Sequence, residues 1–222
     1  MRLLNLSQPC RPLGWALFNL VAGRARQRGH DERWVLRLLI RYPQSQLIAL
    51  SVAHHCLLSR SFKIALAEYL RLHAALPSEP LPLLCIAVSQ LHLVMSRKNT
   101  ARGYSTLVAF GWLRSYGALR DEIEVEYNTG RAYHHLGLLH LAAASYQRVL
   151  KLGAERRGAA EAAARRAKED EEDETAAAAA AASAAAASTQ DLSREAAHNL
   201  SRICQTSGSK ELARSIVRSM PV

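Results

Sequence analysis

Residues 127–152 read YNTGRAYHHLGLLHLAAASYQRVLKL, and this stretch decides the fold. Small and aromatic residues recur in it at the spacing of two helices joined by a turn at Gly137: Gly130, Tyr133, Ala142 and Tyr146. Small side chains let two helices approach closely, and aromatic rings fill the space beside the contact. The stretch therefore predicts a tightly packed, antiparallel helix hairpin.

The hairpin recurs along the chain with a fixed period. Pro43 and Pro77 each end a Leu-rich helical segment, and 77 − 43 = 34 residues is the period of the tetratricopeptide repeat. Units of this length fit at 12–45, 46–79 and 123–156. The sequence predicts an all-α fold, a tetratricopeptide-repeat α-solenoid in which helix hairpins stack into a right-handed superhelix.

Two further units are irregular. One begins at Pro80 and is interrupted at 97–103, and its second helix is expected from about Tyr104 to Tyr116. The last unit begins near Arg194. We expect repeats one to four at 12–152 and the last repeat at 191–222.

Residues 153–190 break the period. They hold an acidic run at 169–174 and two alanine tracts, without an apolar stripe that would dock a helix. Alanine has the highest helix propensity. We therefore predict a low-complexity insertion that is disordered or loosely helical.

Composition agrees with packed helices, because the 222 residues include only 3 Phe, 3 Trp and 7 Tyr. The four cysteines form no CxxC pair and no ligand spacing with histidine, so neither a zinc site nor a disulfide framework is predicted: Cys10, Cys56, Cys85 and Cys204. Apolar runs such as 81–88 are too short to span a bilayer. We expect no cofactor, no metal and no membrane.

The net charge of +10 is typical of proteins that bind the phosphate backbone of nucleic acid, so nucleic-acid binding has to be considered. Its densest basic cluster is Arg24, Arg26 and Arg28, and no aromatic residues alternate with these arginines as a base-stacking surface requires. DNA contact is therefore a secondary expectation. A solvated basic face is the favoured interpretation.

Enzymatic activity is not expected. The histidine pairs 54–55 and 134–135 fit helical repeats, and no Glu, Cys or Asp completes a site at metal spacing. No Gly-rich phosphate loop follows a strand, and no small-molecule substrate is predicted.

The repeat register predicts a partner-binding surface on the first helices of the units. Its candidate residues are almost all apolar in the second and third repeats and polar in the fourth: Leu47, Leu50, His54, Leu57, Leu81, Leu84, Val88, Leu91, Tyr127, Arg131 and His134. In the fifth unit the same places hold Glu195, His198, Arg202 and Gln205. Two interpretations stay open: the apolar residues form a groove for a partner segment, or packing within the superhelix buries them.

The departures from the regular repeat carry a family resemblance. The segments LVAFGWLRSYGALR and GRAYHHLGLLHLA, followed by AAHNLSRICQTSGSKELARSIV, resemble the C-terminal part of the tetratricopeptide-repeat subunit (polypeptide 3) of general transcription factor IIIC. The resemblance covers the chain from about Trp34, apart from 153–190.

The resemblance implies a nuclear scaffold in RNA polymerase III transcription. Its partners would be the other subunits of transcription factor IIIC and, through the complex, the polymerase III initiation factor. The family's N-terminal repeat array is missing, so we expect a fragment, a shortened isoform or an incomplete gene model. A tetratricopeptide-like scaffold in RNA processing is the alternative function. A chaperone-docking clamp is disfavoured, because Leu20, Leu47 and Leu50 occupy places where polar clamp residues are expected.

Overall fold

The computed structural model describes residues 37, 40–42, 45–96, 99–169 and 191–218. The chain divides into two compact units, Met1–Leu119 and Arg120–Val222. Within the described residues every assigned element is an α-helix. The predicted all-α class is confirmed.

In the described part of the first unit, each helix packs against the next: α3 (Gln46–Leu58), α4 (Phe62–Ala75), α5 (Pro80–Val94) and α6 (Arg102–Gly117). Pro80 occupies the first turn of α5, where a missing N–H breaks no helical hydrogen bond. The interval between α5 and α6 agrees with the predicted interruption of the third unit. Almost all of the predicted unit 12–45 lies outside the described residues.

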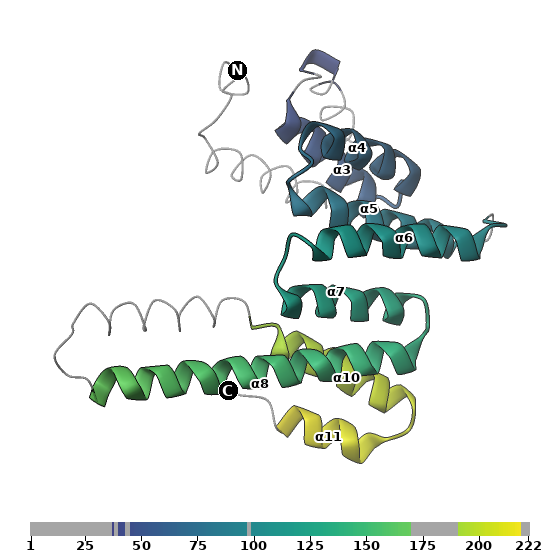
Figure 1. Ribbon diagram of the computed structural model, residues 1–222. Helices are drawn as coiled ribbons and strands as arrows, with labels where there is room; N and C mark the ends of the chain where they lie inside the picture. Colours follow the sequence, from purple (N-terminus) through teal and green to yellow (C-terminus); the bar gives the residue numbers. More distant parts are fainter. Residues whose placement is uncertain (1–36, 38–39, 43–44, 97–98, 170–190, 219–222) are drawn as a thin grey trace. The chain divides into compact units, whose positions relative to one another are not determined.

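The second unit repeats this arrangement with α7 (Glu122–His135), α8 (Leu139–Glu169), α10 (Ser193–Thr206) and α11 (Lys210–Arg218) (Figure 1). α8 packs against both α7 and α10, and α11 packs against α10. Asp121 caps α7, where its Oδ2 accepts a hydrogen bond from the Ile123 amide at 3.2 Å. Sequential helix pairs in both units are compatible with a tetratricopeptide-like solenoid.

Three hairpin turns share one backbone geometry. Arg60, Gly137 and Gly208 have positive φ angles of 63°, 78° and 88°. In each turn the next amide donates to the carbonyl five residues before it: Ser61 to Cys56 at 2.8 Å, Leu138 to Tyr133 at 2.9 Å, and Ser209 to Cys204 at 2.9 Å. This hydrogen bond defines the Schellman motif that ends helices. Glycine adopts the positive φ without strain, so Gly137 and Gly208 suit their turns.

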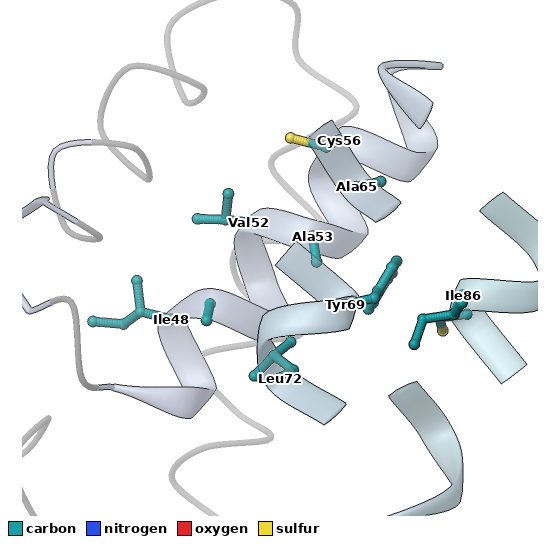
Figure 2. Close-up of a cluster of buried hydrophobic side chains, with 10 residues drawn as sticks. Ile48, Val52, Ala53, Cys56, Ala65, Tyr69, Leu72 and Ile86 are labelled. Atoms are coloured by element: carbon teal, nitrogen blue, oxygen red, sulfur yellow. The ribbon is translucent and has the colours of Figure 1, made fainter. Parts of the chain in front are cut away.

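The core of the first unit is built around Tyr69 of α4, which is fully buried. Figure 2 shows Tyr69 between α3 and Ile86 of α5. Ala53 and Ala65 are also fully buried in this cluster, at the contact between α3 and α4. Their small side chains allow the close helix approach that the repeat pattern predicts.

Tyr146 of α8 is the counterpart of Tyr69 in the core of the second unit, and it is also fully buried. It packs beneath Gly130 of α7. A Cβ added at Gly130 would lie 3.0 Å from Tyr146 Cε1 and 3.1 Å from Ser145 Cβ. The contact therefore requires glycine or a very small shift of α7 away from α8.

α8 is longer than a repeat helix. It continues without a break through residues 153–169, which were predicted to begin the insertion, and residues 170–190 lie outside the described part. Its extension is held by two arginines that reach neighbouring helix ends. Arg156 Nη2 lies 2.7 Å from Asp121 Oδ1 before α7, and Arg157 Nη1 lies 2.5 Å from Asp191 Oδ2 before α10. Ion pairs therefore dock the start of this extension, where the sequence offers no apolar stripe.

Gly153 is buried where α8 packs against the start of α10. A Cβ added there would collide with Ser193 Oγ, which is itself buried and 3.1 Å from Arg157 Nη1. Gly158, five residues later on the same helix, has open space around the equivalent position.

We expect Gly153→Ala to lower the free energy of unfolding of the second unit by about 1–3 kcal/mol, because the methyl group overpacks the contact with α10. Gly158→Ala gains the same helix propensity without the collision, so it is expected to be neutral or to stabilise by up to about 1 kcal/mol. Urea unfolding followed by far-UV circular dichroism measures both. Equal stabilities of the two variants would contradict the packing of α8 on α10.

Candidate partner-binding surface

Eight of the predicted surface residues lie on α3 and α5 of the first unit. Seven of them are half-buried or exposed: Leu47, Leu50, His54, Leu57, Leu81, Leu84 and Val88. Leu81 is the most open of the leucines in this set, with 38% of its surface exposed. α3 and α5 therefore carry a set of apolar side chains that keep part of their surface in solvent.

Leu91 is an exception, and its predicted place on the surface was wrong. Only 4% of Leu91 is exposed. α5 packs against both α4 and α6, so a wider part of its circumference is buried than one repeat contact would require. Leu91 therefore belongs to the core.

Leu50 and Leu57 agree partly with each of the two interpretations, a groove for a partner segment and burial by packing within the superhelix. Each packs against the first core cluster and is nevertheless only partly buried. Burying the rest of such side chains stabilises a complex by about 25 cal/mol per Å² of apolar surface. A partner segment would therefore find a surface that the core already holds in place.

His54 is tied to the core by a hydrogen bond. Its Nδ1 lies 2.7 Å from the hydroxyl oxygen of Tyr69, and the two rings meet edge to face. Burial lowers the pKa of His54 below its usual value, and burial raises the pKa of Tyr69. His54 is thus a neutral ring at pH 7 that positions Tyr69.

The predicted surface residues of the fourth repeat lie together on α7 in the second unit, above Tyr146. They are Tyr127, Arg131 and His134. The Arg131 guanidinium carbon is 5.9 Å from the centre of the Tyr127 ring, and the Tyr127 and Tyr146 rings are 6.0 Å apart. His134 Nδ1 lies 3.5 Å from the Tyr146 hydroxyl oxygen. Burial raises the pKa of Tyr146 to about 12, so this hydroxyl stays protonated.

α10 adds two residues to the same place. Asn199 Nδ2 donates to the Tyr127 hydroxyl oxygen at 3.3 Å, across 72 residues of sequence. Burial lowers the pKa of His134, and the positive charge of nearby Arg202 lowers it further. The register indicated Arg202, but Asn199 was missed, because it lies one residue beyond the place that the register assigns to His198.

Among the described residues, no group of three or more His, Cys, Asp or Glu side chains is placed to hold a metal ion. No described helix combines the length and the apolar character that a membrane span requires. Cys56, Cys85 and Cys204 are buried thiols outside any disulfide, and burial raises the pKa of Cys85 to about 11. The Arg24–Arg28 cluster and Cys10 lie outside the described residues.

No protein-family model matches the chain. Three known proteins do. Human general transcription factor 3C polypeptide 3 is 29% identical over 219 residues, which is 98% of this chain and 22% of that protein. The transcription factor tau subunit sfc4 of Schizosaccharomyces pombe is 31% identical over 173 residues, covering 75% of this chain and 15% of the relative.

The transcription factor tau 131 kDa subunit of Saccharomyces cerevisiae is 32% identical over 100 residues, covering 42% of this chain and 10% of the relative. The chain thus spans about a fifth or less of the length of these relatives. All three are named as subunits or polypeptides of a transcription factor. The resemblance found in the sequence is confirmed: this chain is a homologue of general transcription factor 3C polypeptide 3 and of the yeast transcription factor tau subunits.

Proposed function

We propose that the chain is a protein-interaction scaffold of a transcription factor IIIC-type complex. Its partners are the other subunits of that complex. Through the assembled complex it supports promoter recognition by RNA polymerase III and assembly of the preinitiation complex, including the polymerase III initiation factor. The proposal places the chain in the nucleus, with DNA contact secondary to protein contact.

One observation carries the proposal. α3 and α5 keep apolar side chains partly exposed, and these side chains recur at the first-helix places of two successive repeats: Leu47, Leu50, Leu57, Leu81, Leu84 and Val88. An apolar surface of this kind favours a protein partner, because water contact with it is unfavourable. In a homologue of complex subunits, an apolar segment of a neighbouring subunit is the expected occupant. The polar residues on α7 would bind another part of a partner.

Affinity purification tests the proposal. The tagged chain is recovered from nuclear extract, and the bound proteins are identified by mass spectrometry. Recovery of several transcription factor IIIC subunits is the expected result. A matched variant should replace only residues 170–190 with a Gly/Ser linker of equal length, because residues 153–169 belong to α8 and Asp191 pairs with Arg157, too far from residue 169 for a direct join.

Recovery of ribonucleoproteins in place of these subunits, lost after nuclease treatment, would support the RNA-processing alternative. Recovery of neither group would contradict the scaffold function. We expect the variant without 170–190 to retain its partners, since none of the proposed surface residues lies in that segment.

A further inference from the structure

The α7–α10 face of the second unit holds arginines that no described carboxylate neutralises. Arg131 of α7 and Arg202 of α10 are exposed. Neither forms an ion pair with a described acidic residue, whereas other arginines of the unit do: Arg120, Arg148, Arg156 and Arg157. Arg131 and Arg202 are therefore available to a charged partner.

The side chains beneath these arginines are ordered by contacts between helices. Tyr127 supports Arg131 from below, and Asn199 joins Tyr127 to α10 through its hydrogen bond. His134 is linked to Tyr146, which is fully buried. A guanidinium on a fixed aromatic support loses less conformational entropy on binding than one on a mobile side chain.

The charges on this face are also separated. Glu124 and Glu195 lie in the first turns of α7 and α10, and Arg131 and Arg202 lie seven residues further along each helix, about 10 Å away. Glu124 is already paired with Arg120 at 3.2 Å. A long phosphate backbone laid along the helices would meet these glutamates, whereas a short segment with two carboxylates can contact the arginines alone.

We propose that this α7–α10 face binds an acidic peptide segment of a partner protein, with carboxylates of the segment paired to Arg131 and Arg202. The inference rests on the proposed scaffold function and names the chemistry of one partner. Guanidinium–carboxylate pairs of this kind form two parallel hydrogen bonds and fix the orientation of the bound segment. The Asn199–Tyr127 hydrogen bond joins α7 and α10, the two helices that carry these arginines.

Fluorescence anisotropy with the purified full chain tests the inference. The probe is a short fluorescein-labelled peptide of alternating Glu and Ala at low ionic strength, and the comparison peptide replaces every Glu with Gln. We expect binding of the Glu peptide alone. The double variant Arg131→Gln/Arg202→Gln should weaken it by about tenfold or more, because two charge-assisted contacts are lost.

The matched control is Lys151→Gln/Arg214→Gln, which removes the same two charges from exposed places on α8 and α11. It should change the affinity by less than about threefold, since neither charge lies on the α7–α10 face and the Coulomb energy falls with distance. Circular dichroism of all variants establishes that they fold.

Three results would overturn the inference. They are no binding of the Glu peptide, equal weakening in both double variants, or tighter binding of a single-stranded oligonucleotide that is lost with Arg131→Gln/Arg202→Gln. The last result would make the face a nucleic-acid surface. If the peptide fails to bind while transcription factor IIIC subunits still co-purify with the chain, this inference falls and the scaffold function stands.

Discussion

Tyr146→Ala is expected to lower the free energy of unfolding of the second unit by about 3–5 kcal/mol, the range found when large buried aromatic side chains are truncated. The Tyr146 ring is fully buried in the cluster that joins α7, α8 and α10. Its removal leaves a cavity under Gly130 that α7 cannot fill, because Gly130 has no side chain.

Tyr146→Phe separates packing from hydrogen bonding. It keeps the ring and loses only the contact with His134 at 3.5 Å and the interaction with Asn199, so a loss of about 1 kcal/mol or less is expected. Tyr104→Ala is the surface control, because Tyr104 is 73% exposed and should cost less than about 0.5 kcal/mol.

The two units can be followed separately in this experiment. All three tryptophans lie in the first unit: Trp15, Trp34 and Trp112. Urea unfolding should therefore show Tyr146→Ala as an earlier loss of far-UV circular dichroism, with the tryptophan fluorescence transition much less affected. An unchanged circular dichroism midpoint would contradict the placement of Tyr146 in the core.

Leu50→Glu/Leu84→Glu is expected to reduce recovery of partner subunits by about tenfold or more. Both leucines keep part of their surface accessible, so the carboxylates can stay hydrated in the free chain, whereas a bound apolar segment would desolvate them. Affinity purification with quantitative mass spectrometry measures the loss, and circular dichroism reports the fold. Leu84→Glu alone is the second variant, because Leu50 also packs against the first core cluster.

The control introduces the same charges elsewhere in the first unit. Leu58 is 69% exposed and Ile64 is 55% exposed, and neither belongs to the predicted surface. Leu58→Glu/Ile64→Glu should therefore leave recovery unchanged. A folded Leu50→Glu/Leu84→Glu variant that recovers its partners as well as this control would refute the apolar groove.

Much of the fold could be predicted because the repeat encodes it locally. Gly137 marks a turn with positive φ, and Gly130 marks a close helix contact in which a Cβ would crowd Tyr146. Each requirement concerns one residue and its immediate packing, so it is visible in the sequence. The same reasoning fails at Arg60, where the positive φ of the turn between α3 and α4 occurs without a glycine.

The end of α8 could not be predicted in the same way. Alanine-rich sequence favoured a helix, but what docks the helix is a pair of contacts between residues far apart in sequence. Arg156 reaches Asp121 across 35 residues, and Arg157 reaches Asp191 across 34. Arginines also occur in solvated low-complexity segments that dock on nothing. The sequence alone therefore cannot identify Arg156 and Arg157 as docking residues, whereas the packed structure does.

The predicted surface depended on the assumption that every first helix buries the same side. Leu91 contradicts this assumption, because α5 is covered by both α4 and α6. Asn199 shows the converse, since its hydrogen bond with Tyr127 brings it into the α7–α10 face although the register did not assign it there. Burial of a repeat residue is determined by the neighbouring repeats, and a single-unit register cannot supply that information.

Site-specific photo-cross-linking from Leu84 tests the central claim most directly. A benzophenone amino acid replaces Leu84 in the tagged chain, the complex is assembled in nuclear extract and irradiated, and cross-linked peptides are identified by mass spectrometry. The same substitution at the exposed Lys63 of α4 is the control. The account predicts a cross-link from position 84 to an apolar segment of another transcription factor IIIC subunit, with none from position 63. Cross-links from position 84 only to residues of this chain, in a complex that contains the other subunits, would contradict it.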